Sequence, residues 1–198
     1  MLKRVNATLD RLLTGVQVGS LWLARFGGVL ILLTVGLVTL EVSSRQLTGR
    51  SAVHATELTG YIMAISASWS FAYTLVNKAH IRIDALYLNF SMKVRGVLDL
   101  IAMMAMAIFC LLMVNAVFDV LAHSYRAGST ANTPLSTPLW LPQALWVAGL
   151  AWFCFAVCVI CLRVFFGLLA GDEHSVQRLA GSPTLDEQIE DENKEARS

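Results

Sequence analysis

One uninterrupted apolar run decides the fold: Val29-Leu-Ile-Leu-Leu-Thr-Val-Gly-Leu-Val38. With its flanks it extends from about Trp22 to Leu40, close to the roughly 20 apolar residues that a helix needs to cross a bilayer. Lipid offers no water to backbone N–H and C=O groups, so a segment of this kind must be helical. The run therefore predicts an integral membrane protein.

Three more stretches have the length of a membrane span, at about 58–77, 97–122 and 139–170. The composition agrees, since 56% of the 198 residues are hydrophobic and 15% are charged, against roughly 25% charged in soluble domains. We therefore expect an all-α protein with one membrane domain of four transmembrane helices over residues 1–170.

Charge separates that membrane domain from the end of the chain. Residues 1–170 contain 12 Lys and Arg against 6 Asp and Glu, whereas residues 171–198 contain 3 against 8. The second segment is polar, acidic and poor in large apolar residues, which is the composition of a disordered tail. We expect it to be a disordered cytoplasmic extension.

The positive charges also predict the orientation. Four spans place both termini on one side of the membrane, and nine Lys and Arg lie on that side against three on the other. The nine are Lys3, Arg4, Arg11, Arg25, Lys78, Arg82, Lys93, Arg95 and Arg163, and the three are Arg45, Arg50 and Arg126. By the positive-inside rule both termini are cytoplasmic.

Two connections have amphipathic spacing. In the segment of about 80–95, one helical face carries Ile83, Leu86, Tyr87, Phe90 and Val94, which predicts a helix lying along the membrane interface. Residues 2–16 place Val5, Leu9, Leu12 and Val16 on one stripe. This stripe fits either a second interfacial helix or a solvated continuation of the first span.

The third connection, residues 123–139, differs from the other two. It is rich in small polar residues. Pro134 and Pro138 lie near its end, and Pro142 follows it. We expect it to be extended and stiff on the outer face, with Pro142 at the start of the last helix, where a missing N–H costs nothing.

Packing within the membrane is expected from span two. Ser66, Ser68, Ser70 and neighbouring alanines are small enough for close helix approach. They serve contacts inside this bundle or contacts with another membrane subunit, and the pattern leaves both open. Trp69 and Trp152 lie deep in their spans and are expected to pack between helices.

Redox chemistry is the main enzymatic alternative. Cys154, Cys158 and Cys161 share a helical face, and a four-helix quinone- or thiol-linked oxidoreductase needs reactive thiols at the membrane surface. These cysteines lie within an apolar run, which favours packing instead. The four histidines lie in connections or in the tail, which disfavours a buried haem, so we expect no cofactor. A self-contained small transporter is the third alternative, and the absence of a polar site at a span centre disfavours it.

Taken in order, three motifs resemble a known family. They are Glu57-Leu-Thr-Gly-Tyr61, Lys78-Ala-His-Ile-Arg-Ile-Asp84 and Thr133-Pro-Leu-Ser-Thr-Pro-Leu-Trp140. Over residues 20–170 the chain resembles the small membrane subunit of tripartite ATP-independent periplasmic (TRAP) transporters, the DctQ-like proteins. Ser70 and Gly60 depart from the residues common in that family.

The resemblance implies a non-catalytic scaffold in a bacterial inner membrane. Its partners would be a large membrane subunit with the substrate and sodium sites, a transient periplasmic binding protein for organic acids, and membrane lipid, with no nucleic acid. The residues singled out for structure or partner contacts are Glu57, Ser66, Ser70, His80, Arg82, Asp84 and Trp140. If that region is helical, His80 and Asp84 are one turn apart and pair.

Overall fold

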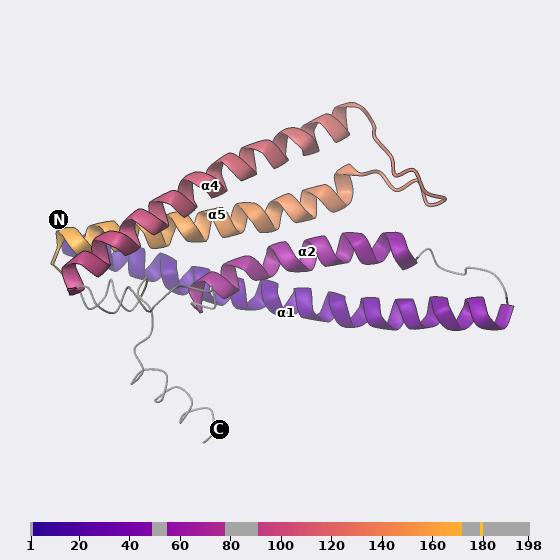
Figure 1. The fold of residues 1–198 in the computed structure, drawn as a ribbon, viewed down its shortest axis with the longest axis horizontal. Coiled ribbons are helices and arrows are strands. Elements are labelled where there is room, and N and C mark those ends of the chain that lie inside the picture. Colours follow the sequence, from indigo (N-terminus) through magenta and orange to yellow (C-terminus); the bar gives the residue numbers. More distant parts are fainter. Residues whose placement is uncertain (1, 49–54, 78–90, 172–178, 180–198) are drawn as a thin grey trace, which may run out of the picture.

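Four long helices make up most of the described chain. The computed structural model describes residues 2–48, 55–77, 91–171 and 179. The helices are α1 (Leu2–Thr48), α2 (Ala55–Val76), α4 (Met92–Arg126) and α5 (Trp140–Leu169) (Figure 1). Each covers one predicted span, and α1, α4 and α5 are long and apolar enough to cross a membrane.

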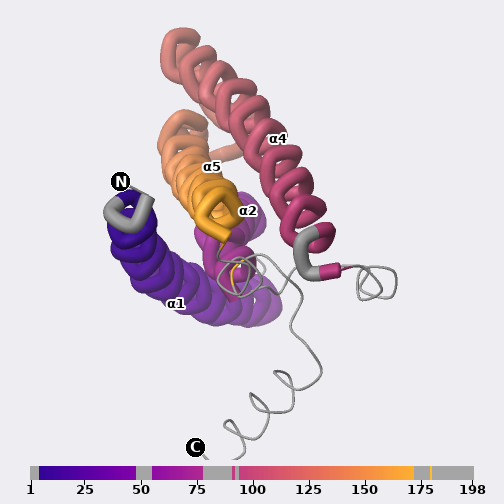
Figure 2. Tube along the Cα trace, turned by 90° about the vertical axis from the view of Figure 1, so that its left-hand side faces the viewer, coloured from indigo at the N-terminus to yellow at the C-terminus, as the bar shows by residue number. Residues whose placement is uncertain are grey.

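The helices form an open row in which successive helices run in opposite directions. Figure 1 shows the order α4, α5, α2, α1 across the molecule. Figure 2 shows α1 and α4 at opposite edges, with α5 and α2 between them. Among the described helices, α5 packs on each of the other three, whereas α4 packs mainly on α5. The two helices at the edges of the row, α1 and α4, therefore do not pack against each other as they would in a closed four-helix bundle.

The core is built on α5. Val157, Val164 and Ala156 of this helix are fully buried, and they join a cluster that includes Val16 of α1 and Cys110 of α4. In the most apolar 18-residue stretch of each helix, half of the residues of α5 are buried, against 11% in α1 and 17% in α4. Most of the apolar surface of α1 and α4 is therefore left for contact with lipid or with another membrane protein.

The N-terminal segment continues the first span without a break, because α1 is helical from Leu2 to Thr48. Leu9, Leu13 and Val16 are buried, whereas Leu12 is 43% exposed. Leu12, a member of the predicted stripe, therefore lies outside the buried side of α1. The continuation is also not solvated on all sides, because its buried side packs against α5.

The third connection, residues 123–139, folds back on itself, so its prediction as an extended segment was wrong. Thr130 and Pro138 form an isolated antiparallel bridge, and Ala131 N–H donates to Thr137 O at 2.9 Å. Ser136 N–H donates to Thr133 O at 3.0 Å, which places Pro134 at the turn position that its fixed φ favours.

Pro142 lies in the first turn of α5, which begins at Trp140, as predicted from its missing N–H. Two other predictions lie outside the described residues. They are the interfacial helix of about 80–95, of which only 91–95 is described, and the acidic tail. Met92 already belongs to α4, so residues 92–95 continue into the third span.

Candidate functional site

The two contact faces of α2 hold this helix between α1 and α5. Ser66 and Ser68 are both 1% exposed. A Cβ added to Gly27 of α1 would lie 3.3 Å from Ser66 O, and one added to Gly149 of α5 would lie 2.5 Å from Ser68 Oγ. Glycine on one helix thus meets serine on the next, and the helices approach closely because neither carries a bulky side chain there.

The serine hydroxyls are directed mainly to their own helix. Ser70 Oγ donates to Ser66 O at 2.8 Å, and Ser68 Oγ donates to Ile65 O at 2.9 Å. Ser66 and Ser68 therefore act chiefly through their small size. For these two residues the structure supports contacts within the bundle, whereas the neighbouring Ala64 and Ala67 are exposed.

Two tryptophans tie α5 to its neighbours. Trp69 Nε1 donates to Leu145 O at 3.0 Å, which joins α2 to α5. Trp152 Nε1 donates to Ser20 Oγ at 3.0 Å, which joins α5 to α1. An indole N–H away from water requires such a partner. The prediction that Trp69 and Trp152 pack between helices is confirmed.

An ion pair between the start of α1 and the end of α5 was not predicted. Arg163 Nε of α5 donates to Asp10 Oδ1 of α1 at 2.7 Å. The Arg163 side chain is 6% exposed and that of Asp10 is 55% exposed. The sequence did contain a signal, since an arginine in an apolar helix needs an acceptor. Only the fold shows that the acceptor comes from a residue 153 positions earlier.

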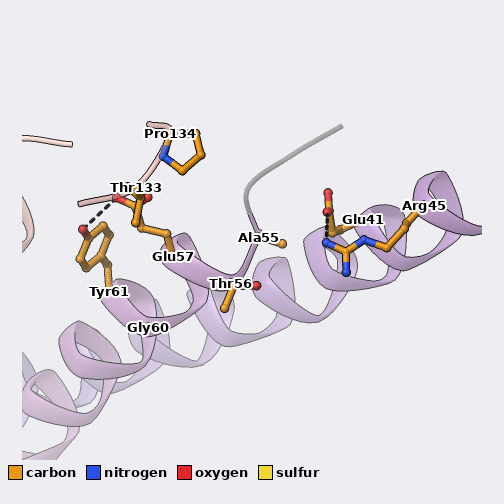
Figure 3. A pocket seen from close by; sticks show the side chains of 9 residues that line it. All are labelled: Glu41, Arg45, Ala55, Thr56, Glu57, Gly60, Tyr61, Thr133 and Pro134. Carbon is orange, nitrogen blue, oxygen red and sulfur yellow. Dashed lines mark hydrogen bonds and ion pairs between the residues drawn. The ribbon is translucent and has the colours of Figure 1, made fainter. Parts of the chain in front are cut away.

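At the far end of α1 and α2, a pocket of about 460 Å³ opens between charged side chains (Figure 3). Glu57 Oε1 accepts a hydrogen bond from Tyr61 Oη at 2.9 Å, and Arg45 lies 3.4 Å from Glu41. Glu57 lies in the first turn of α2, where a carboxylate is favoured by the helix dipole. The remaining lining residues are Ala55, Thr56, Gly60, Thr133 and Pro134.

The other candidate residues fall in two groups. The ring of Trp140 packs edge-on against Tyr125 with centroids 5.8 Å apart, so it joins the adjoining ends of α4 and α5. His80, Arg82 and Asp84 lie outside the described residues. Their roles, and the pairing of His80 with Asp84, stay predictions.

The four cysteines are free thiols. Cys110 and Cys154 are buried, and Cys158 and Cys161 are partly buried. All four pack in or against the core cluster, which agrees with their interpretation as packing residues. Within the described ranges, no group of three or more His, Cys, Asp or Glu side chains is arranged to hold a metal ion.

Comparison with known proteins gives one match. Residues 34–170 match the model of a family described as "Tripartite ATP-independent periplasmic transporters, DctQ component". This range contains α2, α4 and α5 and the C-terminal part of α1. The comparisons with curated proteins and with solved structures gave no match.

Proposed function

The chain belongs to the family of DctQ components of tripartite ATP-independent periplasmic transporters, and from this premise we propose that it acts as a fixed helical scaffold. The family is the small membrane subunit of these transporters, so the chain is a transporter component and not an enzyme. Family membership thereby favours this function over the quinone- or thiol-linked oxidoreductase.

One observation carries the scaffold proposal, namely the uneven burial of the helices. The central helix α5 is held by a glycine–serine contact, two indole hydrogen bonds and an ion pair, whereas α1 and α4 leave most of their apolar surface uncovered. A well-packed interior with large exposed apolar surfaces on both sides suits a subunit that stays fixed in the membrane. Such a subunit enlarges the membrane-embedded area that anchors a moving transport subunit.

The proposed topology has four helices across the bacterial inner membrane, α2 included, with both termini in the cytoplasm. The alternating helix directions support it, and so does the ion pair between Asp10 and Arg163, which holds the start of α1 beside the end of α5. The excess of nine Lys and Arg over three favours the cytoplasm for that end.

The proposed partners are a large membrane subunit and a periplasmic binding protein. In this proposal the large subunit carries the substrate and sodium sites of a symporter, and the binding protein delivers organic acids or related solutes to it. The small subunit itself holds no cofactor. Its contacts are with the large subunit, with lipid and, transiently, with the binding protein.

The test is purification in mild detergent of the tagged chain expressed from its native operon, followed by reconstitution. We expect a large polytopic subunit at equal stoichiometry, solute uptake by vesicles containing both subunits and the binding protein, and no uptake by vesicles containing this chain alone. Recovery of the chain alone with a bound quinone would overturn the proposal. Flux through the chain alone would establish the self-contained transporter instead.

His80 and Asp84 are proposed to fix the connection after α2, and Arg82 is proposed to contact lipid phosphate instead. If His80 and Asp84 pair across one helical turn, Asp84→Asn removes the charge of that pair. We expect less assembled complex and lower uptake, by no more than about twofold, because an exposed pair contributes little. Quantitative blotting of the assembled complex and uptake by vesicles measure the two effects. If both are unchanged, the pairing has no role.

A further inference from the structure

The face of α4 that points away from α5 is apolar over most of its length and becomes polar toward one end. Val97, Ile101, Ile108 and Leu112 lie on this face and are each between 50% and 67% exposed. Asn115 and Asp119 continue it at spacings of three and four residues, which keep one helical face, and both are exposed. We call these six residues the outer face of α4.

The two polar residues lie inside the span predicted over residues 97–122. Tyr125 and Trp140, whose rings pack edge-on, lie at the adjoining ends of α4 and α5, and aromatic rings of this kind favour the membrane interface. At 1.5 Å per residue, Asp119 is about 9 Å and Asn115 about 15 Å from Tyr125 along the helix, and the hydrocarbon core is about 30 Å thick. Side chains in a helix lean toward its N-terminus, so Asp119 leans away from that interface.

Their polar groups are only partly satisfied by the described chain. Asn115 Nδ2 donates to Leu111 O at 2.7 Å, which leaves its carbonyl oxygen for another donor. No hydrogen bond or ion pair joins the carboxylate of Asp119 to the residues that the structure describes. Hydrocarbon is a poor environment for both groups, because lipid tails offer no hydrogen-bond donor.

We propose that the outer face of α4 is the surface that the large membrane subunit covers, with a hydrogen-bond-donating side chain opposite Asp119. This inference rests on the proposed function and assigns its contact surface. A second copy of the chain fits less well. Two copies related by an axis along the membrane normal would place each residue of the shared face near itself. The two Asp119 carboxylates would then repel each other.

The first experiment uses the native complex with a photo-crosslinking amino acid at Leu112. We expect a covalent adduct with the large subunit. Adducts with lipid alone, or with a second copy alone, in a preparation that retains the large subunit would overturn the assigned surface and leave the scaffold function standing. Failure of the unmodified chain to retain any large subunit would overturn the scaffold function itself.

The second experiment measures how much large subunit co-purifies with each variant. Asp119→Leu is expected to weaken the association about three- to twentyfold, the range of one interhelical hydrogen bond in a membrane. Asp119→Asn, which keeps an acceptor, should retain most of it. Thr39→Leu is the matched control. It also replaces an exposed polar side chain in a span, but Thr39 Oγ1 already donates to Val35 O at 2.8 Å. Equal retention by Asp119→Leu and Thr39→Leu would overturn the proposal.

Discussion

Replacing Gly149 with leucine is expected to destroy the packing between α2 and α5. Even a Cβ at this position would lie 2.5 Å from Trp69 Cδ1 and 3.0 Å from the backbone carbon of Ser68. The backbone cannot move aside as a flexible side chain would, so the helices must separate. That separation also breaks the hydrogen bond from Trp69 to Leu145. We expect the free energy of unfolding to fall by about 3 kcal/mol or more, at or beyond the upper end for overpacked cores.

Unfolding by sodium dodecyl sulfate in mixed micelles, followed by tryptophan fluorescence, measures this loss. Gly36→Leu is the matched control, because Gly36 also lies in a membrane helix and a Cβ there meets nothing within 4 Å. The control should be as stable as the wild type or slightly more stable, since leucine favours the helix over glycine by about 1 kcal/mol. Equal stability of the two variants would show that α2 and α5 are not in close contact.

Removing the carboxylate of Asp10 is expected to have the second largest effect. Asp10→Ala leaves the guanidinium of Arg163 buried without this acceptor. Breaking a fully buried pair costs about 3–5 kcal/mol. Because the Asp10 side chain is 55% exposed, water screens part of the interaction, and we expect about 1–3 kcal/mol.

A double-mutant cycle with Arg163→Met measures the coupling between the two residues in the same unfolding assay. The double variant should be more stable than the sum of the single losses predicts, because methionine needs no acceptor. Arg11→Ala is the control. It removes an exposed charge beside Asp10 and should change stability by no more than about 0.5 kcal/mol. Additive losses would mean that the pair contributes nothing.

Local chain properties account for what was correctly predicted. An apolar run of about 20 residues must be helical in lipid whatever surrounds it, so the four helices were found near their predicted positions. Pro142 in the first turn of α5 and the deep Trp69 and Trp152 also follow from local chemistry. The family resemblance came from the order of short motifs and agrees with the family match.

Local patterns were insufficient where a distant segment decided the outcome. Periodicity did not show that Leu13 is buried and Leu12 exposed, because α5 lies against one side of α1 and periodicity alone does not fix the direction of a face. The connection of residues 123–139 turns back because the backbone oxygens of Ser129 and Thr137 accept hydrogen bonds from backbone N–H groups across it. The positions of the three prolines do not reveal this pairing.

The sequence by itself determined that this is a helical membrane subunit of the DctQ family, because span length, polarity and motif order are properties of the chain taken piece by piece. Only the tertiary structure decided which small residues meet, as Gly149 meets Ser68. It also decided that Asp10 accepts from Arg163 and that α4 stands at the edge with Asn115 and Asp119 facing outward. These three features depend on how helices that are far apart in the sequence pack together. A local sequence pattern does not contain the contacts between distant segments that determine this packing.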